Sequence, residues 1–174
     1  MEIRKALTTE YDKLVKLYID MIEEMPRFGM AVGWIMGVYP TYEFLSEQLS
    51  LGNCFVADDN GNFVGAMIIN TLYNEGYDRV KWPVEASSGE FASLHLLGVL
   101  PQYHHQGIGI GLTNKAIEIA KAQGLKALRL DVIDGNNPAR KLYEKCGFYH
   151  VEDINLYYDD CGLVNFYLYE YPLE

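Results

Sequence analysis

The fold of this chain is decided by residues Val99–Gly111, which read Val-Leu-Pro-Gln-Tyr-His-His-Gln-Gly-Ile-Gly-Ile-Gly. An apolar stretch ends at Leu100, a polar turn follows, and alternating glycines then enter an amphipathic segment. Glycine lets backbone N–H groups approach an anion closely, and a helix N-terminus adds unpaired donors and a partial positive charge. The stretch therefore predicts a strand, a turn and a helix that together bind a phosphate or pyrophosphate.

Two other kinds of phosphate-binding loop do not fit these glycines. A Walker A loop ends in Gly-Lys-Ser or Gly-Lys-Thr, whereas this chain has Gly111-Leu112-Thr113. A dinucleotide-binding fingerprint needs the spacing GxGxxG, and neither Gly107 nor Gly109 begins such a spacing. A glycine-rich turn that serves only tight packing is the alternative at this point.

A second segment, Asn136–Phe148, reads Asn-Asn-Pro-Ala-Arg-Lys-Leu-Tyr-Glu-Lys-Cys-Gly-Phe. This segment and Gln106-x-x-Gly109-x-Gly111 closely resemble the two signatures of the GCN5-related N-acetyltransferase (GNAT) family, NxxAxxLYxxxGF and (Arg/Gln)xxGx(Gly/Ala). The resemblance covers residues 91–150 well and the first 90 residues poorly. It implies an acyl-CoA-dependent N-acetyltransferase that moves an acetyl group from acetyl-CoA directly to a primary amine.

The rest of the sequence predicts alternating helices and strands. Strands are expected over residues 3–6, 54–57, 63–69, 91–100, 127–132, 151–158 and 163–171. Helices are expected from Thr8 or Thr9 to Pro26, over 41–51 and 109–123, and from an N-cap at Asn137 to Gly147. The stretch 73–89 is expected to be a loop. This order predicts the α/β class with a mixed sheet covered by helices, and the resemblance implies the GNAT-type central sheet, mostly antiparallel and flanked by helices.

Length, composition and charge restrict the partners. The 174 residues, 49% hydrophobic and 22% charged, are typical of one folded domain over 1–174. A formal net charge of −10 without a Lys/Arg cluster argues against nucleic acid as a partner. Three cysteines without paired spacing and an N-terminus without an apolar segment favour the cytoplasm, and no apolar run predicts a membrane partner. A monomer and a homodimer both stay open.

The resemblance also implies where acetyl-CoA binds. Main-chain groups of Leu97, Gly98 and Val99 face the pantetheine arm, and the N–H of Val99 stabilises the oxyanion of the reaction. The pyrophosphate is held by the amides of a run of turn and helix residues, namely Gln106, Gly107, Ile108, Gly109, Ile110 and Gly111. Asn136 contacts the cofactor or orders the start of its helix. No His/Cys cluster has metal-ligand spacing, so no metal is expected.

Two residues are candidates for acid–base chemistry. Tyr143 takes the position of the family's general acid, which protonates the departing CoA thiolate, and a packed core aromatic is its alternative role. The family's strand glutamate is replaced here by Ser93, so the general base has to be sought elsewhere. His95 follows two residues on along the same strand face and has a pKa of about 6.5 when unperturbed, which makes it our candidate base. A packed histidine is the alternative, and Glu90 acting through water is a second candidate.

The acceptor region carries many aromatic side chains. The far wall of the acceptor site is expected to contain Trp34, Tyr39 and Tyr42. Three tyrosines of the last strand alternate onto one face, where they line the acceptor pocket, cover a dimer interface or pack within the sheet; they are Tyr167, Tyr169 and Tyr171. The acceptor itself, a small molecule or a protein, is not identified by the sequence, and a longer acyl-CoA stays open as the donor. A non-catalytic acyl-CoA-binding sensor or scaffold is the alternative function.

Overall fold

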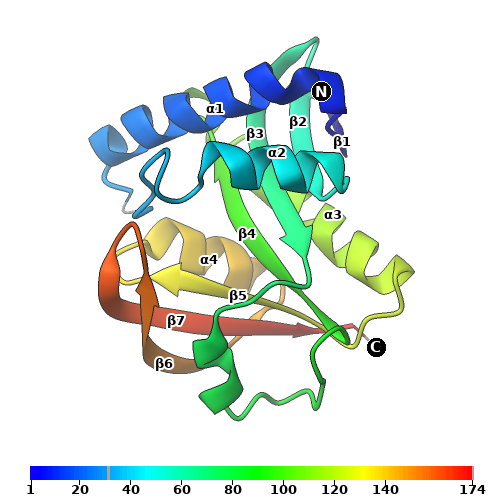
Figure 1. Cartoon of the computed structure of the whole chain (residues 1–174), viewed down its shortest axis with the longest axis vertical. Helices are drawn as coiled ribbons and strands as arrows, with labels where there is room; N and C mark the ends of the chain where they lie inside the picture. The colour runs from blue at the N-terminus through cyan, green and yellow to red at the C-terminus, as the bar shows by residue number, and fades with distance from the viewer. Residues whose placement is uncertain (31, 174) are drawn as a thin grey trace.

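The computed structural model describes residues 1–30 and 32–173. Within this part the chain forms a seven-stranded sheet in the order β1-β2-β3-β4-β5-β7-β6 (Figure 1). All neighbours are antiparallel except the parallel pair β4 and β5. The strands are β1 (Glu2–Lys5), β2 (Cys54–Asp59), β3 (Asn62–Asn70), β4 (Phe91–Val99), β5 (Ala127–Ile133), β6 (Tyr149–Tyr158) and β7 (Gly162–Pro172). This mixed, mostly antiparallel sheet confirms the predicted fold class.

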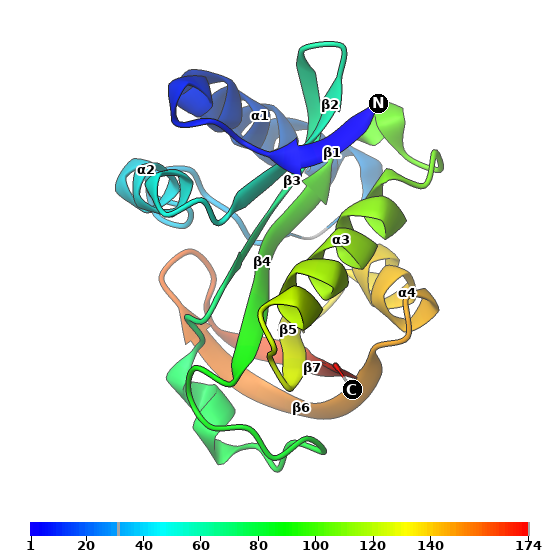
Figure 2. The same ribbon diagram turned by 90° about the vertical axis from the view of Figure 1, so that its right-hand side faces the viewer.

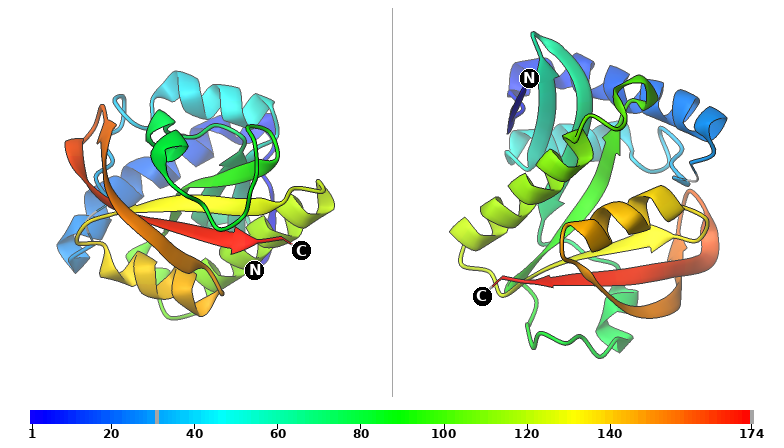
Figure 3. Two further views of the ribbon diagram at one scale, coloured as in Figure 1. Left: turned by 90° about the horizontal axis from the view of Figure 1, so that it is seen from below. Right: turned by 180° about the vertical axis from the view of Figure 1, so that it is seen from behind.

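Helices cover both faces of the sheet. One face carries α1 (Tyr11–Glu24) and α2 (Tyr42–Ser50), and the opposite face carries α3 (Ile108–Ala122) and α4 (Asn137–Lys145) (Figures 1 and 2). The helices α1 and α3 each bury a stripe of side chains spaced three or four residues apart, as an amphipathic helix does. On α1 this stripe is Leu14, Leu17, Tyr18 and Met21. The α3 helix crosses β4 on the viewer's side in the right-hand view of Figure 3 and ends close to the C-terminus.

Strand β4 carries the irregularity that positions the site. It pairs with β5 only over Phe91–Ser93, and beyond Ser93 no further β4–β5 pairs form among the described residues. Its register against β3 also shifts by one residue, at a bulge where Leu96 takes a φ of 50°. The buried hydroxyl of Tyr18 on α1 donates to the carbonyl of Leu96 at 3.0 Å and so stabilises this bulge. The second half of β4 is therefore free of a β5 partner.

Several element boundaries differ from the sequence predictions. Residues Thr8–Glu10 form a 3-10 turn, η1, so α1 begins at Tyr11. The predicted N-cap of α4 is wrong by one residue, because Asn136 accepts a hydrogen bond from the Ala139 N–H at 3.3 Å. An N-cap side chain must reach the N–H of the second or third helical residue, and Ala139 is third when the helix begins at Asn137.

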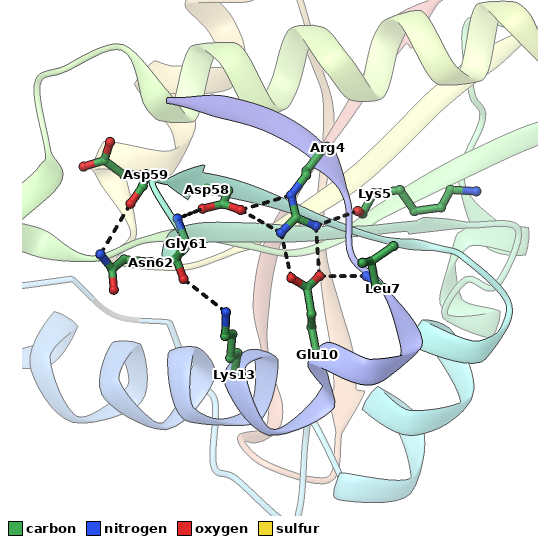
Figure 4. Close-up of polar contacts among 9 residues, drawn as sticks. All are labelled: Arg4, Lys5, Leu7, Glu10, Lys13, Asp58, Asp59, Gly61 and Asn62. Carbon is green, nitrogen blue, oxygen red and sulfur yellow. Dashed lines mark hydrogen bonds and ion pairs between the residues drawn. The ribbon is translucent and has the colours of Figure 1, made fainter.

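Arg4 ties the first strand to its surroundings (Figure 4). Its Nη2 lies 2.7 Å from Glu10 Oε1 on η1 and 2.6 Å from Asp58 Oδ2 on β2. The two carboxylate side chains are only 13% and 14% exposed. The hydrogen bond from Arg4 lowers the pKa of Glu10 to about 2. This network attaches the edge strand β1 to both the helical layer and the sheet.

The predicted loop between β3 and β4 is an ordered cover over β5 and β7. It contains a 3-10 turn, η3 (Glu75–Arg79), and is anchored by a buried ion pair. Arg129 Nε donates to Glu170 Oε2 at 2.8 Å, and the two side chains are 3% and 0% exposed. The same two side chains bind the main chain of Val84, at 2.9 Å to its carbonyl and 2.8 Å to its N–H. The guanidinium lies 4.3 Å from the ring centroid of Trp82, a cation–π contact.

The described residues contain no group of three or more His, Cys, Asp or Glu side chains that could hold a metal ion. Across the same part of the chain, no helix combines the length and the apolar character needed to cross a membrane.

Candidate active site

The larger of two adjoining cavities, about 470 Å³, lies between the end of β4, the start of α3 and α4. Most positions predicted to bind the cofactor line it: Leu97, Gly98, Val99, Gly107, Ile108, Gly109, Ile110, Asn136 and Tyr143. The imidazoles of His104 and His105 line it as well, and Met25, Met30 and Leu142 supply apolar walls. The fold therefore gathers the two sequence motifs around one groove.

The turn before α3 presents backbone N–H groups to this groove. His105 and Gly107 have φ angles of 61° and 80°, and consecutive N–H groups in such a turn form an anion-binding concavity. No side chain caps α3, and the first four N–H groups of a helix, here Gly107 to Ile110, have no partner within it. His104 Nε2 donates to the carbonyl of Val99 at 2.8 Å, which ties the turn to β4.

Two of the predicted phosphate positions lie outside the groove lining, Gln106 and Gly111. The N–H of Gly111 donates to the Gly107 carbonyl at 2.9 Å, so the helix itself uses it. A Cβ on Gly111 would lie 2.7 Å from Ile3 Cδ1, so this glycine allows α3 to pack closely on β1. The structure thus gives Gly111 a packing role, and its predicted contact with the phosphate stays a prediction.

The free edge of β4 offers a main-chain donor at the inner end of the groove. The N–H of Leu100 donates to the Val64 carbonyl on β3 at 2.9 Å. Because successive N–H groups of a strand point to opposite edges, the N–H of Val99 points away from β3. That is the edge where β5 has diverged, and Val99 lines the groove there.

The second cavity, of about 100 Å³, lies between β4, β5, the segment that connects α1 to α2, and the β6–β7 turn. It shares five lining residues with the groove, namely Val32, Leu97, Asn136, Ala139 and Tyr143. Trp34 and Tyr39 line it as predicted for the acceptor wall, whereas Tyr42 lies outside it and is 44% exposed. The two cavities are therefore contiguous, and Tyr143 stands where they meet.

Tyr143 is held in a defined position by packing. The side chain is buried, and its ring contacts Phe148 edge-on with centroids 5.6 Å apart. Burial, with a smaller contribution from the charge of Asp131, raises the pKa of Tyr143 well above its ordinary value. Its hydroxyl makes no hydrogen bond with any described residue, and the residue lines both cavities. Tyr143 is therefore a protonated phenol whose donor is available to a ligand.

His95 lines the second cavity, and its hydrogen-bond partners define which ring nitrogen carries the hydrogen. Its Nε2 lies 3.1 Å from Asn70 Oδ1 and 3.0 Å from the Leu72 carbonyl. Both partners are acceptors, so Nε2 carries the hydrogen and Nδ1 carries a lone pair. Burial lowers the pKa of His95 below its ordinary value of 6.5, so the ring is neutral at pH 7.

Asp131 is a residue of this cavity that the sequence motifs did not reveal. Its Oδ2 accepts hydrogen bonds from the Tyr77 and Tyr158 hydroxyls, both at 2.7 Å. Burial raises the pKa of Asp131, while the two tyrosine donors oppose that rise. The available signal was its position within an apolar strand, where Leu130 and Val132 flank it and point to the opposite face.

Comparison with known proteins identifies the chain. The sequence model of the Acetyltransferase (GNAT) family matches residues 18–148, most of the chain and both motifs. The chain belongs to the acetyltransferase (GNAT) family. It is an acyl-CoA-dependent N-acetyltransferase.

Individual relatives agree with this GNAT assignment. An N-alpha-acetyltransferase of Sulfurisphaera tokodaii is 28% identical over 161 residues, which cover 91% of this chain and 86% of the relative. A thialysine N-epsilon-acetyltransferase of Mus musculus is 31% identical over 98 residues, which cover 55% of this chain and 54% of the relative. The crystal structure of a GNAT acetyltransferase from Streptococcus agalactiae shares the fold, with a TM-score of 0.79, 17% identity, and coverage of 99% of this chain and 95% of the other.

Glu90, the second candidate base, and Ser93, which replaces the family's strand glutamate, both lie away from the cavities of this GNAT protein. Glu90 pairs with Lys126 at 2.7 Å, and it lines neither cavity. Ser93 is fully buried, and its hydroxyl has no hydrogen-bond partner among the described residues. Neither residue is placed to act as the base.

The tyrosines of β7 pack against neighbouring side chains and line neither cavity. Tyr169 is fully buried against α4, where its hydroxyl contacts Arg140 at 3.0 Å and Glu144 at 2.8 Å. Tyr171 packs on Phe148, with ring centroids 5.4 Å apart. Tyr167 lies under the guanidinium of Arg140. The helix α4 thus covers this face of β7, and sheet packing is the role that the structure supports.

Proposed function

We propose that this acetyltransferase takes its acetyl group from acetyl-CoA and passes it directly to a primary amine bound in the second cavity. The single observation that carries this proposal is the junction of the two cavities at Tyr143. A donor in the groove and an acceptor in the cavity would meet beside one protonated phenol and one neutral imidazole. All described strands join one sheet, which supports a single domain over 1–174.

The groove fits the donor on two counts. The unpaired N–H groups of Gly107 to Ile110 suit a pyrophosphate, since anions bind at helix N-termini. A Cβ on Gly107 would meet no atom within 4 Å, so this glycine faces open space where a phosphate can approach the backbone. Leu97, Gly98 and Val99 would hold the pantetheine arm. Acetyl-CoA supplies the activated acetyl thioester when it is bound.

Different residues of the site then act as general base, oxyanion donor and general acid. His95 Nδ1 accepts a proton from the attacking ammonium, and the nitrogen gains the lone pair that forms the new C–N bond. The N–H of Val99 donates to the carbonyl oxygen as negative charge develops on it. The C–S bond breaks, and the Tyr143 hydroxyl gives its proton to the departing sulfur. The acylated nitrogen gives its second proton to the Tyr143 phenolate, and His95 releases the first proton to solvent, so both side chains return to their starting protonation states.

The names of two relatives support an amine nitrogen as the acceptor. One is named for an N-alpha acetylation and the other for the N-epsilon of thialysine. In this chain the proposed acceptor cavity is lined by Trp34 and Tyr39 and by residues of the β6–β7 turn. Its volume of about 100 Å³ suits a slender group.

The experiment that tests the function measures CoA release from acetyl-CoA with a panel of primary amines, together with the melting temperature. We expect one acetylated amine per CoA released. Acetyl-CoA at about a hundredfold excess over its dissociation constant should stabilise the protein by about 2.7 kcal/mol. Stabilisation without turnover of any amine would favour a sensor or scaffold, and no stabilisation would overturn the donor assignment.

A further inference from the structure

The acceptor cavity has a charge that its own lining does not balance. Two carboxylates line it, Asp131 and Asp160, and neither lysine nor arginine is among its lining residues. His95 lines the same cavity and adds no positive charge, because its imidazole is neutral at pH 7. A buried anion is costly unless a positive charge or hydrogen-bond donors accompany it. The cavity is therefore suited to a cationic ligand.

Asp131 keeps one oxygen available for such a ligand. Tyr77 and Tyr158 both donate to its Oδ2, which holds the carboxylate in place. Its Oδ1 makes no hydrogen bond with any described residue. The side chain lies deep between β4 and the β6–β7 turn, and the part that stays exposed faces the cavity.

Asp160 supplies a second, independent acceptor. It lies in the turn between β6 and β7, and its Oδ1 is buried without a hydrogen-bond partner among the described residues. Nearly all buried polar atoms of proteins have a partner, so this oxygen indicates a missing donor. An ammonium group in the cavity would provide it.

Aromatic side chains complete the cation site. Trp34, Tyr39 and Tyr158 line the same cavity, and the rings of Tyr39 and Tyr158 lie 6.1 Å apart with planes inclined by 30°. The faces of aromatic rings attract cations. At about 100 Å³ the cavity admits an unbranched alkylammonium chain.

The two carboxylates differ in their effect on Tyr143. The charge of Asp131 contributes to the raised pKa of Tyr143, the candidate acid. The charges of both carboxylates contribute to the raised pKa values of Tyr39 and Cys161, whereas only that of Asp131 contributes at Tyr143. An ammonium beside Asp131 on β5 is thus closer to the candidate acid than one beside Asp160 in the β6–β7 turn.

We infer that the acceptor is an aliphatic amine with two positive charges, bound with its reacting nitrogen at Asp131 and its second ammonium at Asp160. This inference rests on the proposed function of the site. The reacting nitrogen gives its proton to His95 and is acetylated, while the second ammonium keeps its charge and its contact with Asp160. The product is a monoacetylated amine with one remaining positive charge.

The test compares two amines of equal chain length, 1,4-diaminobutane and n-butylamine, which differ in the second ammonium group. We expect kcat/KM for the diamine to exceed that for the monoamine by about tenfold or more, which is the effect of about 1.4 kcal/mol. In Asp160→Asn the ratio of the two values should fall toward one. The matched control is Asp159→Asn, because Asp159 is exposed and outside the cavity, and it should keep the wild-type ratio.

Calorimetric titration of 1,4-diaminobutane supplies a readout that needs no turnover. We expect binding to the wild-type protein and weaker binding, by about tenfold, to Asp160→Asn. The stabilisation of this variant by acetyl-CoA shows that it is folded. Equal kcat/KM for the two amines, or a higher value for a peptide α-amine of no further charge, would overturn the inference and leave the acetyltransferase function intact. Diamine binding without any acetylation would instead overturn the proposed function.

Discussion

The Nε2 atom of His95 lies 3.1 Å from Oδ1 of Asn70, and this contact sets the protonation state of the candidate base. The Asn70 amide cannot be turned around, because its Oδ1 also accepts from the Leu72 N–H at 2.9 Å and its Nδ2 donates to Gln48 Oε1 at 3.0 Å. Gln48 is itself buried, and its Oε1 accepts a second bond from Asn53. A chain of amides behind the cavity therefore presents an acceptor to His95 and leaves Nδ1 for the substrate.

Asn70→Asp is expected to move the pH dependence of the reaction. Burial holds the pKa of His95 below about 6.5, so the base is neutral above that pH and is lost only as the pH falls further. A carboxylate beside Nε2 favours the protonated ring and raises the pKa of His95. The acid limb of kcat at saturating amine should therefore shift to higher pH. Nitrogen NMR of His95 should show the hydrogen on Nε2 in the wild type.

The control for this variant is Asn114→Asp, which adds the same charge on the exposed surface of α3. An acid limb that moves equally in both variants would assign the effect to overall charge rather than to Asn70. A wild-type His95 with its hydrogen on Nδ1 would contradict the proposed role of Asn70 directly.

Tyr143→Phe is expected to lower kcat by about 10²–10⁴-fold, the usual contribution of a general acid. The ring keeps its contact with Phe148, so stabilisation by acetyl-CoA should persist. The control is Tyr171→Phe, which removes a hydroxyl from a ring on the other side of Phe148 and lies outside both cavities. Steady-state kinetics and melting curves of the two variants would test this. A kcat that changes as little in Tyr143→Phe as in Tyr171→Phe would remove Tyr143 from the mechanism.

Glu170→Gln is expected to destabilise the fold by about 3–5 kcal/mol, because it leaves the buried charge of Arg129 without its counter-ion. The comparable change Glu90→Gln breaks a pair with Lys126 whose side chains are 42% and 51% exposed, and should cost at most about 1 kcal/mol. Urea denaturation measures both. If the two variants lost the same free energy of unfolding, the segment between β3 and β4 would not depend on the buried ion pair.

Protonation of Glu10 at low pH is expected to weaken the contact that holds β1 and so to lower the stability of the fold. The pKa of Glu10 is lowered to about 2, so its contribution to stability is complete above the ordinary glutamate value of about 4.3 and is lost as the pH falls toward 2. Glu10→Gln should therefore reduce the loss of stability between neutral and acid pH. Glu118→Gln, in an exposed pair with Lys115, is the control. Denaturation curves at several pH values would show whether the two variants differ.

The sequence by itself determined the parts of this protein that depend on neighbouring residues. The turn at Gly107 and the segment Asn136–Phe148 were predictable, because helix starts and phosphate-binding turns follow from residues close together in the chain. The hydrophobic alternation likewise predicted most strands and helices. These local rules did not reveal the close packing of Gly111 on Ile3, which depends on how α3 lies against β1.

The acceptor cavity, in contrast, was decided only by the tertiary structure. Asn70, His95, Asp131 and Asp160 come from three strands and a turn, and no short spacing relates them. They meet because β4 bulges at Leu96 and parts from β5, and because the β6–β7 turn closes on the segment before α2. Local sequence patterns carry no information on such long-range contacts, since the register and divergence of strands depend on packing across the whole sheet.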